Sequence, residues 1–108
     1  EKYEQVGSTV TCNPPPENTD LDYLLLVPDA TKFCNDAVSM EWKIEGDEYE
    51  LDQFISLRQV KVNLFVTEDN KFYEKFLLAT HVCKSLNVML KKDRIIVFQA
   101  VLYGNKQS

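Results

Sequence analysis

The sequence has little of what zinc sites, disulfide frameworks and membrane segments need. Its 108 residues include a single histidine, His81, and three cysteines with no CxxC pair among them. An odd number of widely spaced thiols predicts reduced cysteines in a cytoplasmic protein, and it argues against a zinc site. No apolar run approaches the roughly 20 residues that a membrane-spanning helix requires. We therefore expect neither a membrane partner nor a disulfide scaffold. The cysteines are Cys12, Cys34 and Cys83.

Positive charge is also scarce. There are 17 acidic residues against 12 basic ones, which gives a net charge of −5. Proteins that coat nucleic acids need a basic face, so this balance argues against that class without excluding a nucleotide bound through a metal ion. The apolar share of 44% supports a packed core, and the length predicts one domain over residues 1–108. No signal peptide is visible, and the opening at Glu1 leaves open that the natural N-terminus is missing.

The first two thirds of the chain are typical of strands. Residues 6–12 and 21–27 are rich in Thr, Val and Leu, and three prolines mark the stretch between them as a loop. Asp29 is expected to cap a short helix that runs to Ser39. Beyond this helix the pattern predicts a strand over 41–44 with Trp42 and Ile44 on one face, a turn at Gly46-Asp47, a charged connection over 48–52, and a hairpin of strands at 54–58 and 60–66.

The last third is typical of helices. Thr67 is predicted as an N-cap, with Glu68 and Asp69 in the first turn, and a second helix is expected over 92–103 with Gly104 as its C′ residue. We therefore predict an α+β fold, a mixed β-sheet with helices packed on it. In the helix after Thr67 the predicted core stripe consists of Phe72, Phe76, Ala79, Cys83 and Leu86. In the helix over 92–103 it consists of Ile95, Phe98 and Leu102.

The pair Asp20-Leu21-Asp22 is the pattern that points to chemistry. Side chains at positions i and i+2 of a strand project from the same face, so the two carboxylates converge. Converging carboxylates hold hard divalent cations such as Mg²⁺ and the phosphates that these cations carry. The Gly7-Ser8 turn upstream adds backbone amides and a hydroxyl that can bind phosphate.

This arrangement resembles the signature of the nucleotidyltransferase superfamily to which DNA polymerase β belongs. The signature is a hydrophobic residue, Gly, then Gly or Ser, a loop, and Asp-hydrophobic-Asp-hydrophobic. Here the pattern is Val6-Gly7-Ser8, residues 9–19, and Asp20-Leu21-Asp22-Tyr23. The resemblance implies a minimal nucleotidyltransferase fold.

The second half of the chain is similar to small nucleotidyltransferase-like proteins encoded by bacteriophages. If that resemblance holds, the protein acts in the cytoplasm of the host cell. The residues that carry it are Phe54 to Arg58, Val62 to Thr67, Ala79-Thr80, Cys83-Lys84, Asp93 to Ile95 and Phe98 to Gly104.

The superfamily resemblance implies roles for particular residues. Gly7 and Ser8 would hold the triphosphate of an NTP, and Asp20 and Asp22 would bind Mg²⁺, or Mn²⁺ in its place. Apart from the resemblance, Arg58 is a candidate phosphate contact because it precedes the core strand over 60–66. Lys84, on the predicted helix that follows Thr67, is a further candidate for nucleotide binding.

Asn63 departs from the superfamily pattern. A third acid on a later strand would complete the catalytic metal site, and the equivalent position here is Asn63. Its amide can offer an oxygen to a metal but carries no charge and cannot act as a base. We therefore include Asn63 with Asp20 and Asp22 as candidate catalytic residues and expect the catalytic metal to be weakened.

Each of these features also has a structural interpretation. The two aspartates could end a solvated loop, Gly7-Ser8 could be an ordinary turn, and Arg58 could form a surface ion pair. His81 is expected on a helix surface, and Trp42 and Tyr103 in the core or at its rim. The basic side chains Lys84, Lys91, Lys92 and Arg94 could simply form a solvated face.

Two functions follow as hypotheses. The first is a Mg²⁺-dependent transferase, active or degenerate, that moves a nucleoside monophosphate from an NTP to a hydroxyl acceptor not identified by the sequence. The resemblance implies that so small a member of the superfamily needs a partner chain or a second protomer for the other wall of its cleft. The second is a non-catalytic phage protein that docks on a host enzyme and inhibits or redirects it, since an acidic protein is drawn quickly to a basic partner.

Overall fold

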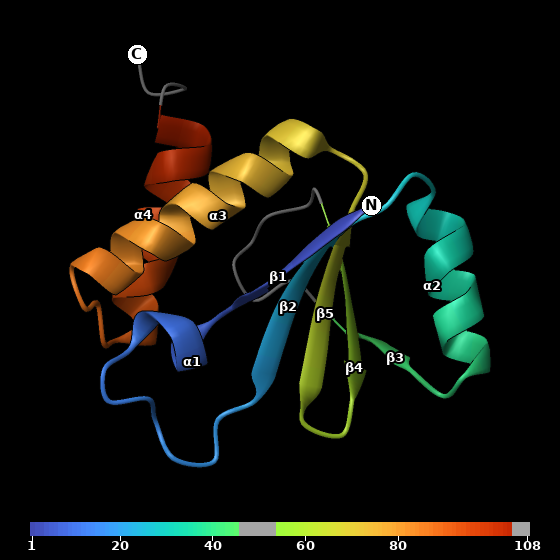
Figure 1. Cartoon of the computed structure of the whole chain (residues 1–108), viewed down its shortest axis with the longest axis horizontal. Coiled ribbons are helices and arrows are strands. Elements are labelled where there is room, and N and C mark those ends of the chain that lie inside the picture. The colour runs from blue at the N-terminus through green and yellow to red at the C-terminus, as the bar shows by residue number, and fades with distance from the viewer. Residues whose placement is uncertain (46–53, 105–108) are drawn as a thin grey trace.

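The computed structural model describes residues 1–45 and 54–104. It contains a five-stranded sheet in the order β1-β2-β5-β4-β3 with helices on both faces (Figure 1), so the predicted α+β fold is confirmed. The turn predicted at Gly46-Asp47 and the connection over 48–52 lie outside the described residues. The strands are β1 (Lys2–Val6), β2 (Leu21–Leu26), β3 (Lys43–Glu45), β4 (Ile55–Gln59) and β5 (Val62–Thr67). The helices are α1 (Ser8–Thr11), α2 (Ala30–Ser39), α3 (Asn70–Ser85) and α4 (Lys91–Tyr103).

The centre of the sheet is the parallel pair β2 and β5, and the other neighbours run antiparallel. Both central strands carry apolar side chains on both faces, as expected for strands that are covered on two sides. β4 and β5 form the predicted hairpin, but its turn is Val60-Lys61, inside the strand predicted over 60–66. None of the helices among the described residues is long and apolar enough to cross a membrane.

Two hydrophobic cores lie on opposite faces of the sheet. α3 and α4 pack on one face around Leu24, Phe65 and Phe76, and α2 packs on the other around Leu57 and Val66. In the first core the ring of Phe76 lies within 4.7–6.2 Å, centroid to centroid, of four other phenylalanine rings. The sheet therefore couples the two cores.

The predicted helical stripes are confirmed except at one end. Four members of the α3 stripe are at most 2% exposed, and in α4 Phe98 and Leu102 are buried, with Ile95 partly buried against them. Leu86 was predicted in the stripe but is 69% exposed. It is the C-cap of α3, where the chain turns away from the core.

The strand predicted over 6–12 is wrong. β1 ends at Val6, and residues 8–11 form the short helix α1. Gly7 has a φ of +82°, and its carbonyl accepts the N–H groups of Val10 and Thr11 at 3.0 Å each. Thr11 and Cys12 are buried beside α3 and α4. These tertiary contacts override the strand preference of the β-branched residues.

The start of α3 was also predicted wrongly. Thr67 is the last residue of β5, and the N-cap is Asp69, whose carboxylate accepts the N–H groups of Lys71 and Phe72. The Thr67 hydroxyl instead accepts the N–H of Asp69. Glu68 leaves the helix altogether, because its Oε2 accepts the N–H of Ala30 at 2.6 Å and so caps α2.

Two further side chains differ from expectation. Trp42 precedes β3 instead of belonging to it. It is partly buried against the α2 core, whereas Ile44 is 63% exposed. Arg94 was predicted on a solvated face but is 8% exposed, and its Nη1 donates to the carbonyls of Val88 and Met89 and to the thiol of Cys12. The connection between α3 and α4 packs against Arg94, whose donors satisfy these carbonyls.

Candidate polar site on the sheet

Three of the predicted site residues occupy one row across the sheet. Asp22 of β2 lies opposite Asn63 of β5, and Asn63 lies opposite Arg58 of β4. Directly opposed residues on neighbouring strands project from the same face, so the three side chains meet. Leu24 and Phe65, two residues further along β2 and β5, belong to the α3 and α4 core. The polar row therefore lies on that face, beyond the end of the core.

Asp20 joins this row from the loop just before β2. Its Oδ2 accepts a hydrogen bond from Arg58 Nη1 at 2.6 Å and one from Asn63 Nδ2 at 3.4 Å. Asn63 Nδ2 also donates to Asp22 Oδ1 at 2.8 Å, while Asn63 Oδ1 accepts from Arg58 Nη1 at 3.3 Å. We call these four residues, Asp20, Asp22, Arg58 and Asn63, the polar cluster. In it the amide donates to both carboxylates and the guanidinium neutralises one of them.

Arg58 sets the electrostatics of the cluster. Its hydrogen bond to Asp20 holds the pKa of that carboxyl below its ordinary value, with Asn63 and the charge of Lys61 acting in the same direction against partial burial. The same contact raises the pKa of Arg58. Both side chains keep about a third of their surface in solvent, 36% for Arg58 and 29% for Asp20. The pair is therefore accessible to a competing ligand.

Gly7 lies against the cluster for a steric reason. A Cβ atom at this position would overlap the side chain of Asp22, and the φ of +82° is one that residues with side chains rarely adopt. Only glycine lets the chain turn from β1 into α1 this close to the carboxylate. The neighbouring hydroxyl of Ser8 pairs with that of Thr19 at 2.7 Å. Gly7 and Ser8 thus lie beside Asp22 and the loop that leads into β2.

Lys84 is not brought to this site. It is exposed in the last turn of α3, and no hydrogen bond or ion pair within residues 1–45 and 54–104 joins it to the polar cluster. Its role in nucleotide binding stays a prediction without geometric support.

His81 is exposed on the surface of α3, as expected, and the three cysteines are free and buried.

The residues of the cluster fit one divalent cation better than two. Two carboxylates are suitable oxygen ligands for Mg²⁺ or Mn²⁺, and they keep a net negative charge after pairing with one guanidinium. For a second metal the described residues offer no further acid at the cluster, and Asn63 turns its N–H₂ group toward the two carboxylates. In the described part of the chain no group of three or more His, Cys, Asp or Glu side chains is placed to hold a metal ion.

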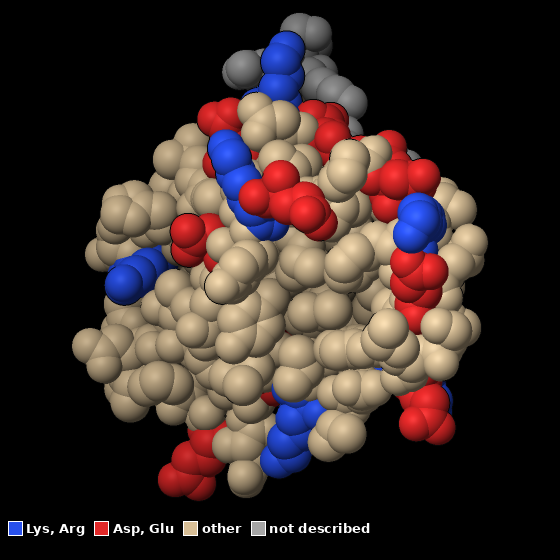
Figure 2. All heavy atoms as spheres, turned by 45° about the vertical axis from the view of Figure 1, so that its right-hand side comes forward, with Lys and Arg blue, Asp and Glu red and all other residues tan. Residues whose placement is uncertain are grey.

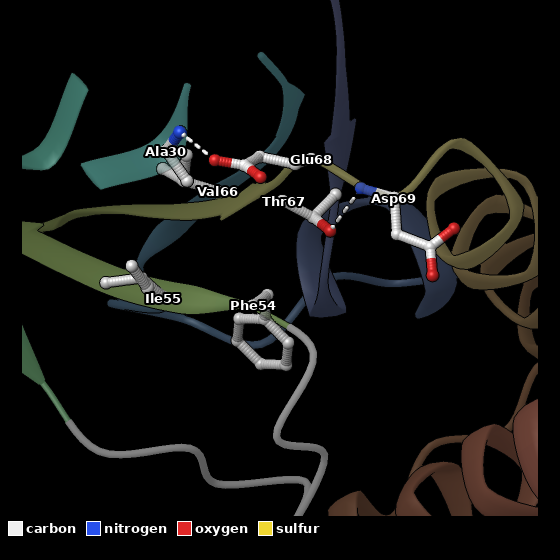
Figure 3. Close-up of a pocket in the computed structure, with 7 residues that line it drawn as sticks. All are labelled: Ala30, Phe54, Ile55, Val66, Thr67, Glu68 and Asp69. Atoms are coloured by element: carbon white, nitrogen blue, oxygen red, sulfur yellow. Dashed lines mark hydrogen bonds between the residues drawn. The ribbon is translucent and has the colours of Figure 1, made fainter. Parts of the chain in front are cut away.

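A separate pocket of about 400 Å³ lies where β5 ends, between the starts of α2 and α3 (Figure 3). Ala30, Thr67, Glu68 and Asp69 line it together with apolar side chains. Glu68 and Thr67 are both engaged in the capping hydrogen bonds described above. The N-termini of α2 and α3 are thus occupied by Glu68 and Asp69, respectively.

Sequence reasoning found the members of the polar cluster but not how they pair. Arg58 was a candidate phosphate contact, and its 2.6 Å bond to Asp20 was expected only as an unspecified surface ion pair. The available signal was the hairpin itself: a two-residue turn places Arg58 opposite Asn63. The contacts of Thr19 and Glu68 had no signal in the sequence.

Comparison with solved structures finds a similar fold in the crystal structure of the conserved protein GrpB from Enterococcus faecalis. The likeness covers 98% of this chain and 82% of GrpB, with a TM-score of 0.53 and 16% sequence identity. No model of a protein family matches the chain, and no curated protein matches it. At this identity the likeness bears on the fold alone. The resemblances to the nucleotidyltransferase superfamily and to phage-encoded proteins both stay predictions.

Proposed function

We propose that this chain is a nucleotidyltransferase-like protein that binds an NTP together with one divalent cation and has lost efficient transfer of the nucleoside monophosphate. The observation that carries the proposal is the pairing within the polar cluster. Asn63 donates to both carboxylates, and Arg58 lies 2.6 Å from Asp20. The cluster retains the two carboxylates that would hold a metal with its phosphates, but it lacks the third acid.

The loss of transfer follows from what an amide can do. Attack by a hydroxyl on the α-phosphorus needs the hydroxyl to lose its proton, and an amide cannot accept a proton near neutral pH. A bound Mg²⁺ would neutralise phosphate charge and orient the triphosphate. Arg58, which is partly exposed, can then exchange its bond to Asp20 for charge-assisted bonds to phosphate oxygens. Gly7 and Ser8 would add backbone amides on the side of Asp22.

A titration with Mn²⁺ and a fluorescent NTP tests this proposal. We expect metal-dependent nucleotide binding by the unaltered chain and its loss in the double variant Asp20→Ala with Asp22→Ala. Asp36→Ala is a matched control, because Asp36 is an exposed acid on α2 paired with Lys32. If the unaltered chain binds no nucleotide in the presence of Mn²⁺, the proposal is wrong.

Two variants separate binding from transfer. Arg58→Gln removes the competing cation, so we expect Mn²⁺ to bind more tightly than in the unaltered chain. Asn63→Asp restores a third acid, and we expect it to raise Mn²⁺ affinity and to give measurable transfer from a labelled NTP to water or a hydroxyl. Strong transfer by the unaltered chain would contradict the assignment of Asn63.

A second candidate function is docking on another enzyme, a host enzyme if the chain is phage-encoded. Three apolar side chains support it, two beside or on the edge strand β3 and one in the turn between β4 and β5. Met40, Ile44 and Val60 are 67%, 63% and 83% exposed, and Gln59 Nε2 bonds to the Met40 carbonyl at 3.0 Å. We expect capture of a basic partner from lysate by the unaltered chain and its loss in Ile44→Glu. Equal capture by both forms would refute docking at this edge.

A further inference from the structure

β1 is the longer of the two edge strands of the sheet. It pairs with β2 alone among the described strands, whereas β3, at the opposite edge, spans only three residues. All of β1 except Val6 is exposed. The outer side of an edge strand presents backbone N–H and C=O groups that favour pairing with another strand unless something blocks it. The segment Lys2–Val6 contains no proline or glycine, and its register with β2 runs without a bulge.

The charges of β1 select one way of pairing. Lys2 and Glu4 project from the same face of the strand and flank Tyr3. Antiparallel pairing of two copies centred on Tyr3 places Lys2 opposite Glu4 of the second copy, and Glu4 opposite its Lys2. Centring on Glu4 would oppose two like charges, and parallel pairing in register would oppose Lys2 to Lys2. We propose that two copies of this chain join their sheets through β1, antiparallel and centred on Tyr3.

The face of β1 that carries Tyr3 also favours a second copy of this chain as the partner. Tyr3 is 74% exposed beside a pocket of about 430 Å³, on the face of the sheet that carries α2. Figure 2 brings the α2 side forward and shows a broad uncharged area between charged groups at its upper and lower rims. In the proposed pair the second copy's Tyr3 would lie about 5 Å from Tyr3 on this face. Each ring would cover the other and extend the pocket wall. The pocket is lined mainly by Tyr3, Tyr23, Leu25, Phe33 and Leu64.

β3 provides an internal comparison. Lys43, Ile44 and Glu45 repeat the pattern of a basic and an acidic residue on either side of an apolar one. However, β3 offers only these three residues for pairing. We therefore assign self-association to β1 and use β3 as the control. The inference is independent of nucleotide binding, since it involves none of the polar cluster.

Sedimentation velocity over a range of concentrations measures this association. A pair of short strands makes an interface at the small end of the specific range, so we expect dimers at roughly micromolar to millimolar concentration. Lys2→Glu should weaken association by about tenfold, because two attractive pairs become repulsive. Adding Glu4→Lys to Lys2→Glu should restore it. Lys43→Glu should leave it unchanged.

A covalent test reads the register directly. Tyr3→Cys should yield a disulfide-linked dimer under mild oxidation, since the three native thiols are buried and free. Circular dichroism would establish that each variant remains folded. A chain that is monomeric at all concentrations would overturn the proposal. So would a dimer that Lys43→Glu disrupts and Lys2→Glu does not, or a charge exchange that fails to restore association.

Discussion

At the scale of single residues, Arg58 decides the character of the polar cluster. The superfamily pattern predicts carboxylates that are free to bind a metal ion. Here a guanidinium of the same chain lies 2.6 Å from Asp20, and the amide of Asn63 serves as a donor to both acids. The cluster is thereby satisfied without any ligand, and a cation must compete with Arg58 for Asp20.

The ion pair between Arg58 and Asp20 makes a pH-dependent contribution to stability. The pKa of Asp20 is lower in the folded chain than its ordinary value of about 4. The contribution is therefore fully present above about pH 4 and is lost as the pH falls through the lower folded pKa. We expect Arg58→Gln to be less stable than the unaltered chain in urea at about pH 7, and the gap to shrink at about pH 2.5. A gap that is equal at both values would show that the ion pair is not its source.

Val60 carries backbone strain at the hairpin turn. Its φ is +54°, a conformation that β-branched residues rarely adopt, and its side chain is 83% exposed. Because glycine suits this position of a two-residue turn and no packing is lost, Val60→Gly should stabilise the chain by about 1 kcal/mol in urea unfolding. Val60→Thr keeps the branching at Cβ and should change little. A loss of stability on Val60→Gly would contradict this account.

At the scale of elements, helix ends are fastened by residues outside their own helices. Glu68 belongs to the β5–α3 connection yet caps α2, and Arg94 of α4 satisfies carbonyls in the turn after α3. The Glu68 contact joins the segment after β5 to the helix after β2, where Asp29, the N-cap of α2, accepts the N–H of Lys32 at 3.0 Å.

Glu68→Ala tests the cap on α2. The carboxylate accepts the N–H of Ala30 at 2.6 Å, at the helix end where negative charge is favourable. Its removal should cost about 1 kcal/mol of unfolding free energy. Glu17→Ala, an exposed acid in the proline-rich loop, should have no measurable effect. Equal effects of the two substitutions would show that charge reduction, and not capping, is responsible.

At the scale of the whole molecule, the two cores share one sheet. Phe76 is 1% exposed in the core beneath α3 and α4, and Trp42, the only tryptophan, packs against the core beneath α2. Leu24 and Leu57, on the two faces, are both fully buried. Because β2 and β5 contribute to both cores, the loss of one core should destabilise the other.

We therefore expect Phe76→Ala to lower the free energy of unfolding to the same extent whether a probe lies in one core or the other. Removing this ring leaves a cavity among four other phenylalanines, which costs about 3–5 kcal/mol. The unfolding curve from Trp42 fluorescence should shift together with that from far-ultraviolet circular dichroism. Phe33→Ala, on the other face and only partly buried, should cost less. Two separate transitions in the Phe76 variant would show that the cores unfold independently.

Local periodicity was sufficient for much of this fold. The apolar run of β2, the hairpin of β4 and β5, and the stripes of α3 and α4 each repeat within a few residues, so the sequence alone identifies them. The position of Arg58 was not identified in this way, because the two-residue turn at Val60-Lys61 that sets Arg58 opposite Asn63 falls inside the strand predicted over 60–66.

Contacts between distant segments decided the rest. α1 replaces a predicted strand because Gly7 turns beside Asp22 and the helix packs against α3. Arg94 is buried because it donates to carbonyls in the connection between α3 and α4. The same kind of contact turned the metal-binding pattern of Asp20 and Asp22 into an ion-paired cluster. Sequence spacing brought these acids together, but only the packing of β4 beside β5 placed Arg58 among them, since a charge is neutralised by whatever lies next to it in space.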